Sequence, residues 1–263
     1  MPNLEYARVD EQPLLLDLYL APVAETPHPL IVWVHGGAWR AGSKSDVPIQ
    51  ALVERGFSIA SVDYRLSPVA RFPAQVHDIK AAIRYLRANA EKHHFDPQRF
   101  VIAGSSAGGH LAALVGVSNG HKELEGQVGD HLAVSSDVQA IVSFFGASNL
   151  ETILSQSTPH GLSVRVPALQ LLLGGQPTEQ PELAQLASPI THVDDRDPPL
   201  LLIHGDQDPQ MPINQSHELD GAYQRVKRTC QFEVIHGGAH GGPPFFDLAR
   251  LEIVEQFLRQ SLR

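Results

Sequence analysis

The chain has 263 residues, 43% of them hydrophobic, which suits a single α/β domain with a sizeable core. Its formal net charge of −9 argues against nucleic acid or an anionic membrane surface as a partner. The single cysteine, Cys230, excludes a disulfide within the chain and a cysteine-based metal site.

The first ten residues and the apolar runs of the chain give no sign of an export signal or a membrane span. No apolar run approaches the roughly 20 residues that span a membrane, and residues 1–10 lack the basic and apolar segments of a signal peptide. We therefore expect a cytoplasmic protein, or a periplasmic or secreted one if a leader precedes the chain. The sequence leaves a homodimer open.

In chain order, short apolar runs alternate with segments that have helical spacing. Strands are predicted at residues 14–20, 30–34, 57–62, 100–103, 138–145, 199–203 and 230–235, with a weaker one at 6–9. Helices are predicted at residues 46–55, 74–94, from 107 onward, at 212–225 and at 245–262. This alternation predicts a mostly parallel, doubly wound sheet, which binds ligands at the carboxyl ends of its strands.

Residues 146–193 form the longest stretch without a predicted strand. The stretch holds a short apolar helix near residues 168–173, and helix breakers stand at Pro167, Gly174, Gly175 and Pro177. We expect a small cap or lid inserted in one domain of residues 1–263, rather than a second domain.

The segment 104–108, GSSAG, joins a predicted buried strand directly to a predicted helix. Such a sharp turn needs very small side chains around it, and it strains the backbone of the residue at its apex. The apex residue is Ser106, whose hydroxyl would stand above the sheet edge at a helix N-terminus, where developing negative charge is favoured. Ser106 is therefore the candidate nucleophile.

Polar or glycine-rich motifs follow four of the predicted strands, beginning at His35, Gly104, His204 and His236. If these strands are parallel, all four motifs meet at one sheet edge. Acyl transfer through a serine needs a nucleophile, a base, a group that orients the base, and donors for the oxyanion.

The remaining parts of a serine-hydrolase site can be assigned among these motifs. His240 is the candidate base, because an imidazole can take the serine proton near neutral pH. Asp208 would orient His240, which gives the chain order Ser, Asp, His. The backbone N–H groups of Gly36, Gly37 and Ala107 are the candidate oxyanion donors.

Other interpretations of the same residues remain open. Asp206 competes with Asp208 as the acid, and His35 and His204 suit hydrogen bonds to loop backbone. Trp39 is either a core residue or a wall of the acyl pocket, where it would bind substrate. His204, Asp206, Asp208, His236 and His240 could be imagined as metal ligands, but the paired-histidine helix motif of zinc hydrolases is missing. We expect no metal and no cofactor.

Five motifs together resemble those of a known family: HGGAW (35–39), DYRLSP (63–68), GSSAGGHLAAL (104–114), HGDQDPQMP (204–212) and GGAHGG (237–242). They are similar to α/β-hydrolase carboxylesterases, most of all to the bacterial feruloyl/acetyl-xylan esterase-like group and to relatives of hormone-sensitive lipase. The resemblance implies an α/β-hydrolase fold, with Ser106, Asp208 and His240 as the triad. The chain departs from the lipase relatives in reading GSSAG rather than GDSAG and in lacking their long N-terminal cap.

We therefore expect a serine carboxylesterase that hydrolyses small-molecule substrates, namely short-chain or aryl (feruloyl- or acetyl-type) esters, through an acyl-serine intermediate. Kynurenine formamidases also carry an HGGxW motif, so an amide or formamide hydrolase on the same triad is the alternative. A further alternative is a ligand-binding protein that kept the fold without catalysis.

Overall fold

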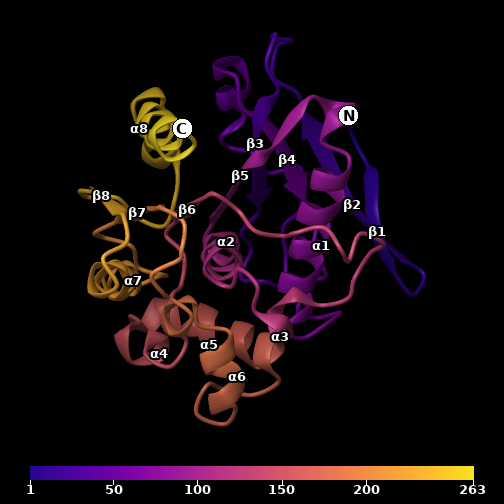
Figure 1. Ribbon diagram of the computed structural model, residues 1–263. Helices are drawn as coiled ribbons and strands as arrows, with labels where there is room; N and C mark the ends of the chain where they lie inside the picture. The colour runs from indigo at the N-terminus through magenta and orange to yellow at the C-terminus, as the bar shows by residue number, and fades with distance from the viewer.

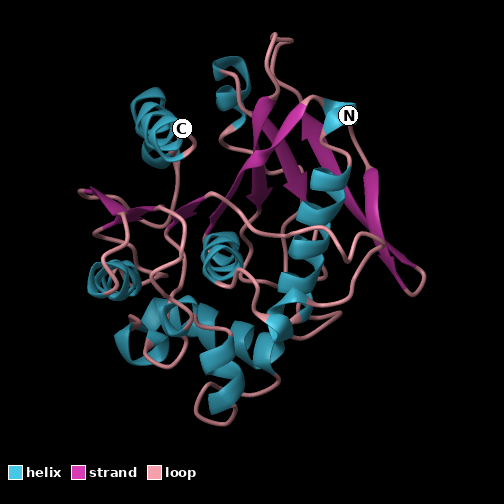
Figure 2. Cartoon of the chain, in the orientation of Figure 1, coloured by secondary structure: helices cyan, strands magenta, loops and turns pink.

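The computed structural model describes residues 1–263 and shows one eight-stranded sheet flanked by helices (Figures 1 and 2). The strand order is β1-β2-β4-β3-β5-β6-β7-β8. The first two strands pair antiparallel, as do β2 and β4, and every other pair is parallel. The strands are β1 (Leu4–Val9), β2 (Gln12–Tyr19), β3 (His28–Val34), β4 (Ser58–Val62), β5 (Phe95–Ser105), β6 (Ala140–Phe144), β7 (Leu200–Gly205) and β8 (Cys230–Ile235). The predicted mostly parallel sheet is confirmed.

Helices cover both faces of this sheet (Figure 1). The α-helices are α1 (Ala74–Ala88), α2 (Ala107–Val117), α3 (Lys122–Glu125), α4 (Ile153–Gln156), α5 (Pro159–Leu173), α6 (Pro181–Leu186), α7 (Asn214–Arg225) and α8 (Leu248–Ser261). The chain also forms four short 3₁₀ helices: η1 (Gln50–Arg55), η2 (Glu91–His93), η3 (Pro189–Thr191) and η4 (Pro243–Phe245). None of these helices has both the length and the apolar character needed to cross a membrane.

The core has two parts because successive strand side chains point to opposite faces. On β3, Leu30, Val32 and Val34 belong to the larger cluster of buried residues, which includes side chains of α1, α2 and α7. Ile31 and Trp33 belong to the smaller cluster on the other face, with side chains of η1 and α8. The continuous apolar run of this strand therefore contributes side chains to both clusters, as expected for a central parallel strand.

The helix predicted at 46–55 is shorter in the structure and begins only at Gln50, as a 3₁₀ helix. Pro48 explains the difference, because proline lacks an N–H and disfavours the helical conformation of the residue before it. The carbonyl of Asp46 instead accepts a hydrogen bond of 2.7 Å from the indole of Trp33.

Between β6 and β7 the chain forms α4, α5, α6 and η3, and α4, α5 and α6 gather at one end of the molecule (Figure 1). The predicted short helix near 168–173 is instead a 15-residue helix that begins at Pro159 and continues through Pro167. The side chain of Thr158 accepts a hydrogen bond from the N–H of Gly161, and Gly174 ends the helix in the left-handed conformation. These two caps offset the intrahelical bond that Pro167 cannot donate.

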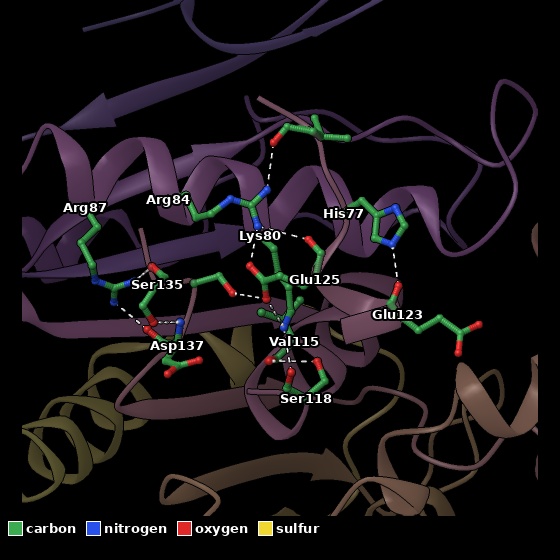
Figure 3. Close-up of polar contacts among 12 residues, drawn as sticks. His77, Lys80, Arg84, Arg87, Val115, Ser118, Glu123, Glu125, Ser135 and Asp137 are labelled. Carbon is green, nitrogen blue, oxygen red and sulfur yellow. Dashed lines mark hydrogen bonds and ion pairs between the residues drawn. The ribbon is translucent and has the colours of Figure 1, made fainter. Parts of the chain in front are cut away.

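A group of polar side chains lies between α1 and the segment around α3 (Figure 3). Lys80 and Arg84, both buried on α1, form ion pairs with the carboxylate of Glu125. Lys80 also donates to the carbonyl of Ser118, and Arg84 to the carbonyl of Val128. We call these three charged residues the α1–α3 cluster.

Candidate active site

Ser106 stands at the junction of β5 and α2 with backbone angles of φ 54° and ψ −117°. This conformation is strained for a residue with a side chain, and close packing around the turn requires glycine on both sides. A Cβ at Gly104 would lie 2.4 Å from the carbonyl oxygen of Gly108, and a Cβ at Gly108 would lie 2.0 Å from that of Val34. The sequence GSSAG therefore produces the sharp strand-to-helix turn predicted for it.

A chain of hydrogen bonds connects Ser106, His240 and Asp208. The Oγ of Ser106 lies 2.9 Å from Nε2 of His240, and Nδ1 of His240 lies 2.6 Å from Oδ2 of Asp208. An ionised carboxylate only accepts, so Nδ1 carries the proton and donates it to Asp208. Nε2 is then free to accept the hydroxyl proton of Ser106, which is the arrangement a general base requires.

Asp208 is buried and held by several donors. Its Oδ1 accepts from the backbone N–H groups of Gln210 and Met211, at 2.8 and 2.9 Å. Burial alone would raise the pKa of this carboxyl. The imidazoles of His204 and His240 and the N–H of Met211 more than offset that effect and hold the pKa well below its usual value. Asp208 is therefore ionised at every pH at which the protein would work.

The competing residues lie elsewhere. Asp206 accepts from Nδ1 of the exposed His236 and from the N–H of Gly237, whereas the hydrogen bond of His240 goes to Asp208. His204 donates from Nε2 to the carbonyl of Met211, and Nδ1 of His35 bonds the carbonyl of Gly36. Both histidines thus bond loop backbone, as predicted. The structure contains no group of three or more His, Cys, Asp or Glu side chains arranged to hold a metal ion.

The loop after β3 brings backbone donors close to Ser106. A Cβ built on Gly36 would lie 3.4 Å from that of Ser106, and Gly37 lines the same cavity as the serine. Gly37 has a φ of 109°, which only glycine adopts without strain. Ala107, the first residue of α2, follows Ser106 directly. The three residues predicted to supply oxyanion donors therefore lie beside Ser106.

Trp39 is a correction to the expected substrate pocket. Its side chain has no exposed surface, and its indole donates to Nδ1 of His110 over 3.0 Å. His110 in turn donates to the carbonyl of Ala187, between α6 and η3. Backbone geometry explains the placement, because Ala38 and Trp39 both have positive φ angles and the turn directs the indole inward. Trp39 is a core residue that joins the loop after β3 to α2, and His110 joins α2 to the segment after α6.

A cavity of about 350 Å³ opens above Ser106 and His240. Three side chains that line it were not predicted from the sequence. Phe145 packs its ring edge-on against His240, with centroids 4.8 Å apart, and Arg40 and Arg165 reach the cavity from the β3 loop and α5. A signal for Phe145 is its place at the carboxyl end of the strand predicted at 138–145. The signal for Arg165 was a lone charge in an apolar helix, VRVPALQLLL.

Comparison with known proteins agrees with this geometry. The family model described as BD-FAE matches residues 16–223. Esterase LipC of Mycobacterium tuberculosis is 31% identical over 244 residues, which are 91% of this chain and 58% of LipC. The chain thus spans a little over half of this curated relative.

Two solved structures cover the chain more evenly. A truncated carbohydrate esterase from gut microbiota is 33% identical, covers 100% of this chain and 95% of its own, and superposes with a TM-score of 0.88. An esterase from Thermogutta terrifontis, solved with propionate bound, is 26% identical with a TM-score of 0.80, covering 98% and 93%. By its sequence and by the fold it shares with these esterases, the chain belongs to the BD-FAE family and has the α/β-hydrolase fold.

Proposed function

We propose that this protein is a serine carboxylesterase that hydrolyses short-chain or aryl esters through an acyl intermediate on Ser106. The observation that carries the proposal is the continuous hydrogen-bonded chain from Ser106 through His240 to Asp208. Relatives named as esterases support it.

In the first half-reaction, Oγ of Ser106 attacks the ester carbonyl carbon while Nε2 of His240 takes the hydroxyl proton. The tetrahedral intermediate collapses when the bond to the alcohol oxygen breaks, and His240 gives its proton to the departing alcohol. In the second half, His240 takes a proton from water, whose oxygen attacks the acyl-serine. The carboxylic acid leaves and the proton returns to Ser106.

Two features would lower the barriers of these steps. The N–H groups of Gly36, Gly37 and Ala107 would donate to the carbonyl oxygen as it becomes negative, and losing one such donor typically costs about 10²–10³ in kcat. The ionised Asp208 stabilises the imidazolium that forms twice in each cycle.

The cavity supports a small or flat acyl group. Its volume of about 350 Å³ is near the lower limit for ligand pockets. A long acyl chain would leave methylene groups in water, and each would forfeit about 0.8 kcal/mol. Phe145 supplies an apolar wall beside His240 on which an aromatic acyl group could pack. We expect kcat/KM to peak between acetyl and butyryl esters.

The test combines one substitution with a substrate panel. Ser106→Ala should lower kcat/KM for p-nitrophenyl acetate by at least about 10⁴-fold with an unchanged circular dichroism spectrum. Ser105→Ala is the matched control, because Ser105 is the neighbouring hydroxyl and makes no hydrogen bond to His240. Near-normal turnover by the Ser106 variant would refute the proposal.

The panel compares p-nitrophenyl acetate, butyrate and decanoate with methyl ferulate, acetylated xylan and N-formylkynurenine. Highest kcat/KM on the decanoate would contradict the small acyl site. A higher kcat/KM on N-formylkynurenine than on every ester would show that the protein is a formamide hydrolase that uses the same three residues.

A further inference from the structure

Arg165 is the feature of the cavity that ester hydrolysis does not explain. Its side chain lies on α5, is only 1% exposed, and lines the same cavity as Ser106 and His240. Both Nε and Nη2 are buried without a hydrogen-bond partner. Arginine is almost never fully buried unless it is paired, because burying a charge without a partner is costly. A group from outside the chain would complete this site.

No protein carboxylate is placed to serve as that partner. Asp208 is near enough to raise the pKa of Arg165, but burial has the larger effect and lowers that pKa to about 10. The oxygens of Asp208 are already occupied by His240 and by the N–H groups of Gln210 and Met211. Arg165 is charged at neutral pH, and its charge is unmatched by any hydrogen-bonded anion.

The charge of the cavity is opposite to that of the molecule. Ten residues line it, and they include Arg40 and Arg165 but no aspartate or glutamate. The whole chain carries a net charge of −9. Two like charges that repel each other would both gain from one anion between them, and a guanidinium matches the planar, two-oxygen geometry of a carboxylate.

The position of Arg165 is fixed by the packing of α5. Thr158, which caps the helix, donates through its hydroxyl to the carbonyl of Pro209, in the loop that follows Asp208. Gly161 packs so closely that a Cβ there would lie 2.9 Å from the carbonyl oxygen of Gln210. Arg165 follows one turn later. The helix that carries Arg165 and the loop that carries Asp208 are therefore held together.

We propose that Arg165, assisted by Arg40, binds a carboxylate carried by the ester substrate, so that the site selects esters with a negative charge near the scissile carbonyl. This inference rests on the proposed esterase function and names a substrate class for it. The carboxylate could belong to the acyl part, as in a half-ester of a dicarboxylic acid, or to the alcohol part, as in an acetylated hydroxy acid. Both present the same chemistry to Arg165.

The experiment uses two matched pairs of esters. For the acyl side, mono(4-nitrophenyl) glutarate is compared with 4-nitrophenyl pentanoate, after subtraction of uncatalysed hydrolysis. For the alcohol side, 4-acetoxybenzoate is compared with 4-acetoxybenzamide. The readout is the ratio of kcat/KM for the charged ester to that for the neutral one, in the wild type and in the variants Arg165→Met, Arg165→Lys and Arg40→Met.

We expect a ratio above one in one pair for the wild type, and Arg165→Met should lower it by about 10- to 100-fold, mainly through KM. Arg165→Lys should lower the ratio less than Arg165→Met does, because an ammonium keeps the positive charge but lacks the paired, planar donors of a guanidinium. Arg196→Met is the control, since Arg196 is exposed in the loop before β7 and should leave the ratio unchanged. The pair that responds identifies which side carries the carboxylate.

Three results would overturn the inference. They are a wild-type ratio at or below one in both pairs, a ratio that Arg165→Met leaves unchanged with both esters hydrolysed as by the wild type, and a ratio left unchanged because charged and neutral esters lose kcat/KM equally. The last result would make Arg165 an oxyanion stabiliser or a structural residue.

Binding to the Ser106→Ala protein separates this inference from the proposed function. Calorimetric affinities for the four intact esters should show the same charge preference, and Arg165→Met in that background should remove it. If Ser106→Ala still hydrolyses the esters, the proposed mechanism fails. If it binds charged and neutral esters equally, the inference fails.

Discussion

Two groups of buried charges in this molecule use similar side chains in different ways. In the α1–α3 cluster, Arg84 donates from both terminal nitrogens to partners within the chain, and Lys80 shares the carboxylate of Glu125 with it. In the cavity, Arg165 is buried to the same degree but has no hydrogen-bonded anion. The charges of the first group are paired within the chain, although Nε of Arg84 has no partner, and this pairing stabilises the fold. The second leaves donors free, so it can act on a ligand.

The two aspartates that follow β7 also differ in their partners, and only one of them bonds the catalytic imidazole. Asp206 is bonded to the exposed His236, whereas Asp208 is bonded to the imidazole that contacts Ser106. Asp208→Asn should lower kcat/KM by about 10⁴-fold, because the wrong tautomer of His240 would then face the serine. Asp206→Asn should change kcat/KM by no more than a few-fold. Equal effects of the two substitutions in ester hydrolysis assays would remove the distinction.

The α1–α3 cluster should contribute to the free energy of unfolding and have no effect on kcat/KM. Arg84→Met leaves the half-buried Glu125 with Lys80 and removes three hydrogen bonds. We expect the free energy of unfolding to fall by about 3 kcal/mol, the lower end of the range for broken buried ion pairs, because Lys80 remains. Urea denaturation measures this change. A large loss of kcat/KM at a temperature where the variant is folded would contradict it.

His110 gives stability a dependence on pH. Burial lowers the pKa of its imidazole to about 4, so the folded protein keeps it neutral where an unfolded chain would bind a proton. A depressed histidine pKa contributes stability that is complete above about pH 6.5 and is lost as the pH falls toward 4. We expect a loss of about 2 to 3 kcal/mol between pH 7.5 and pH 4.5.

His110→Gln is the variant that isolates this effect, since an amide can both accept from Trp39 and donate to Ala187 without titrating. The loss on acidification should be smaller in the variant by that amount. Asp197 acts in the opposite direction, because burial raises its pKa to about 7 and stability then falls as the pH rises from 4 to 7. Asp197 is present in both proteins, so it cancels in the difference. Identical pH profiles would show that His110 does not titrate as described.

The smallest change in stability is expected for Arg165→Met, and it distinguishes the two buried arginines by its sign. Arg165→Met removes a buried charge that has no partner and keeps a similar volume, so stability should be unchanged or raised by up to about 2 kcal/mol. Arg84→Met, the matched substitution in the α1–α3 cluster, should have the opposite sign. If Arg165→Met costs as much as Arg84→Met, Arg165 is a structural residue.

The positions of the strands along the chain and the main candidate site residues were predictable because their signals are local. Apolar runs identify buried strands, and the small residues around Ser106 identify the sharp turn. The alternation of strands and helices then brings Ser106, Asp208 and His240 to one sheet edge. Each of these steps needs only a few neighbouring residues.

The features that were missed depend on contacts between distant segments. The helix α5 continues through Pro167 because its two caps and its packing outweigh one lost hydrogen bond. The buried indole of Trp39 finds its hydrogen-bond acceptor in His110, 71 residues away, which the sequence around Trp39 does not reveal. Arg165 becomes informative only when its surroundings are known, since a charge in an apolar helix does not reveal whether a partner lies opposite.

Covalent labelling shows whether the side chains around Ser106 perform acyl transfer. The wild-type protein is treated with a fluorophosphonate, which reacts with activated serines, and its peptides are mapped by mass spectrometry. We expect one labelled residue, Ser106, and no label in the His240→Ala variant under the same conditions. Label on Ser105, or undiminished ester hydrolysis after Ser106 is fully modified, would contradict it.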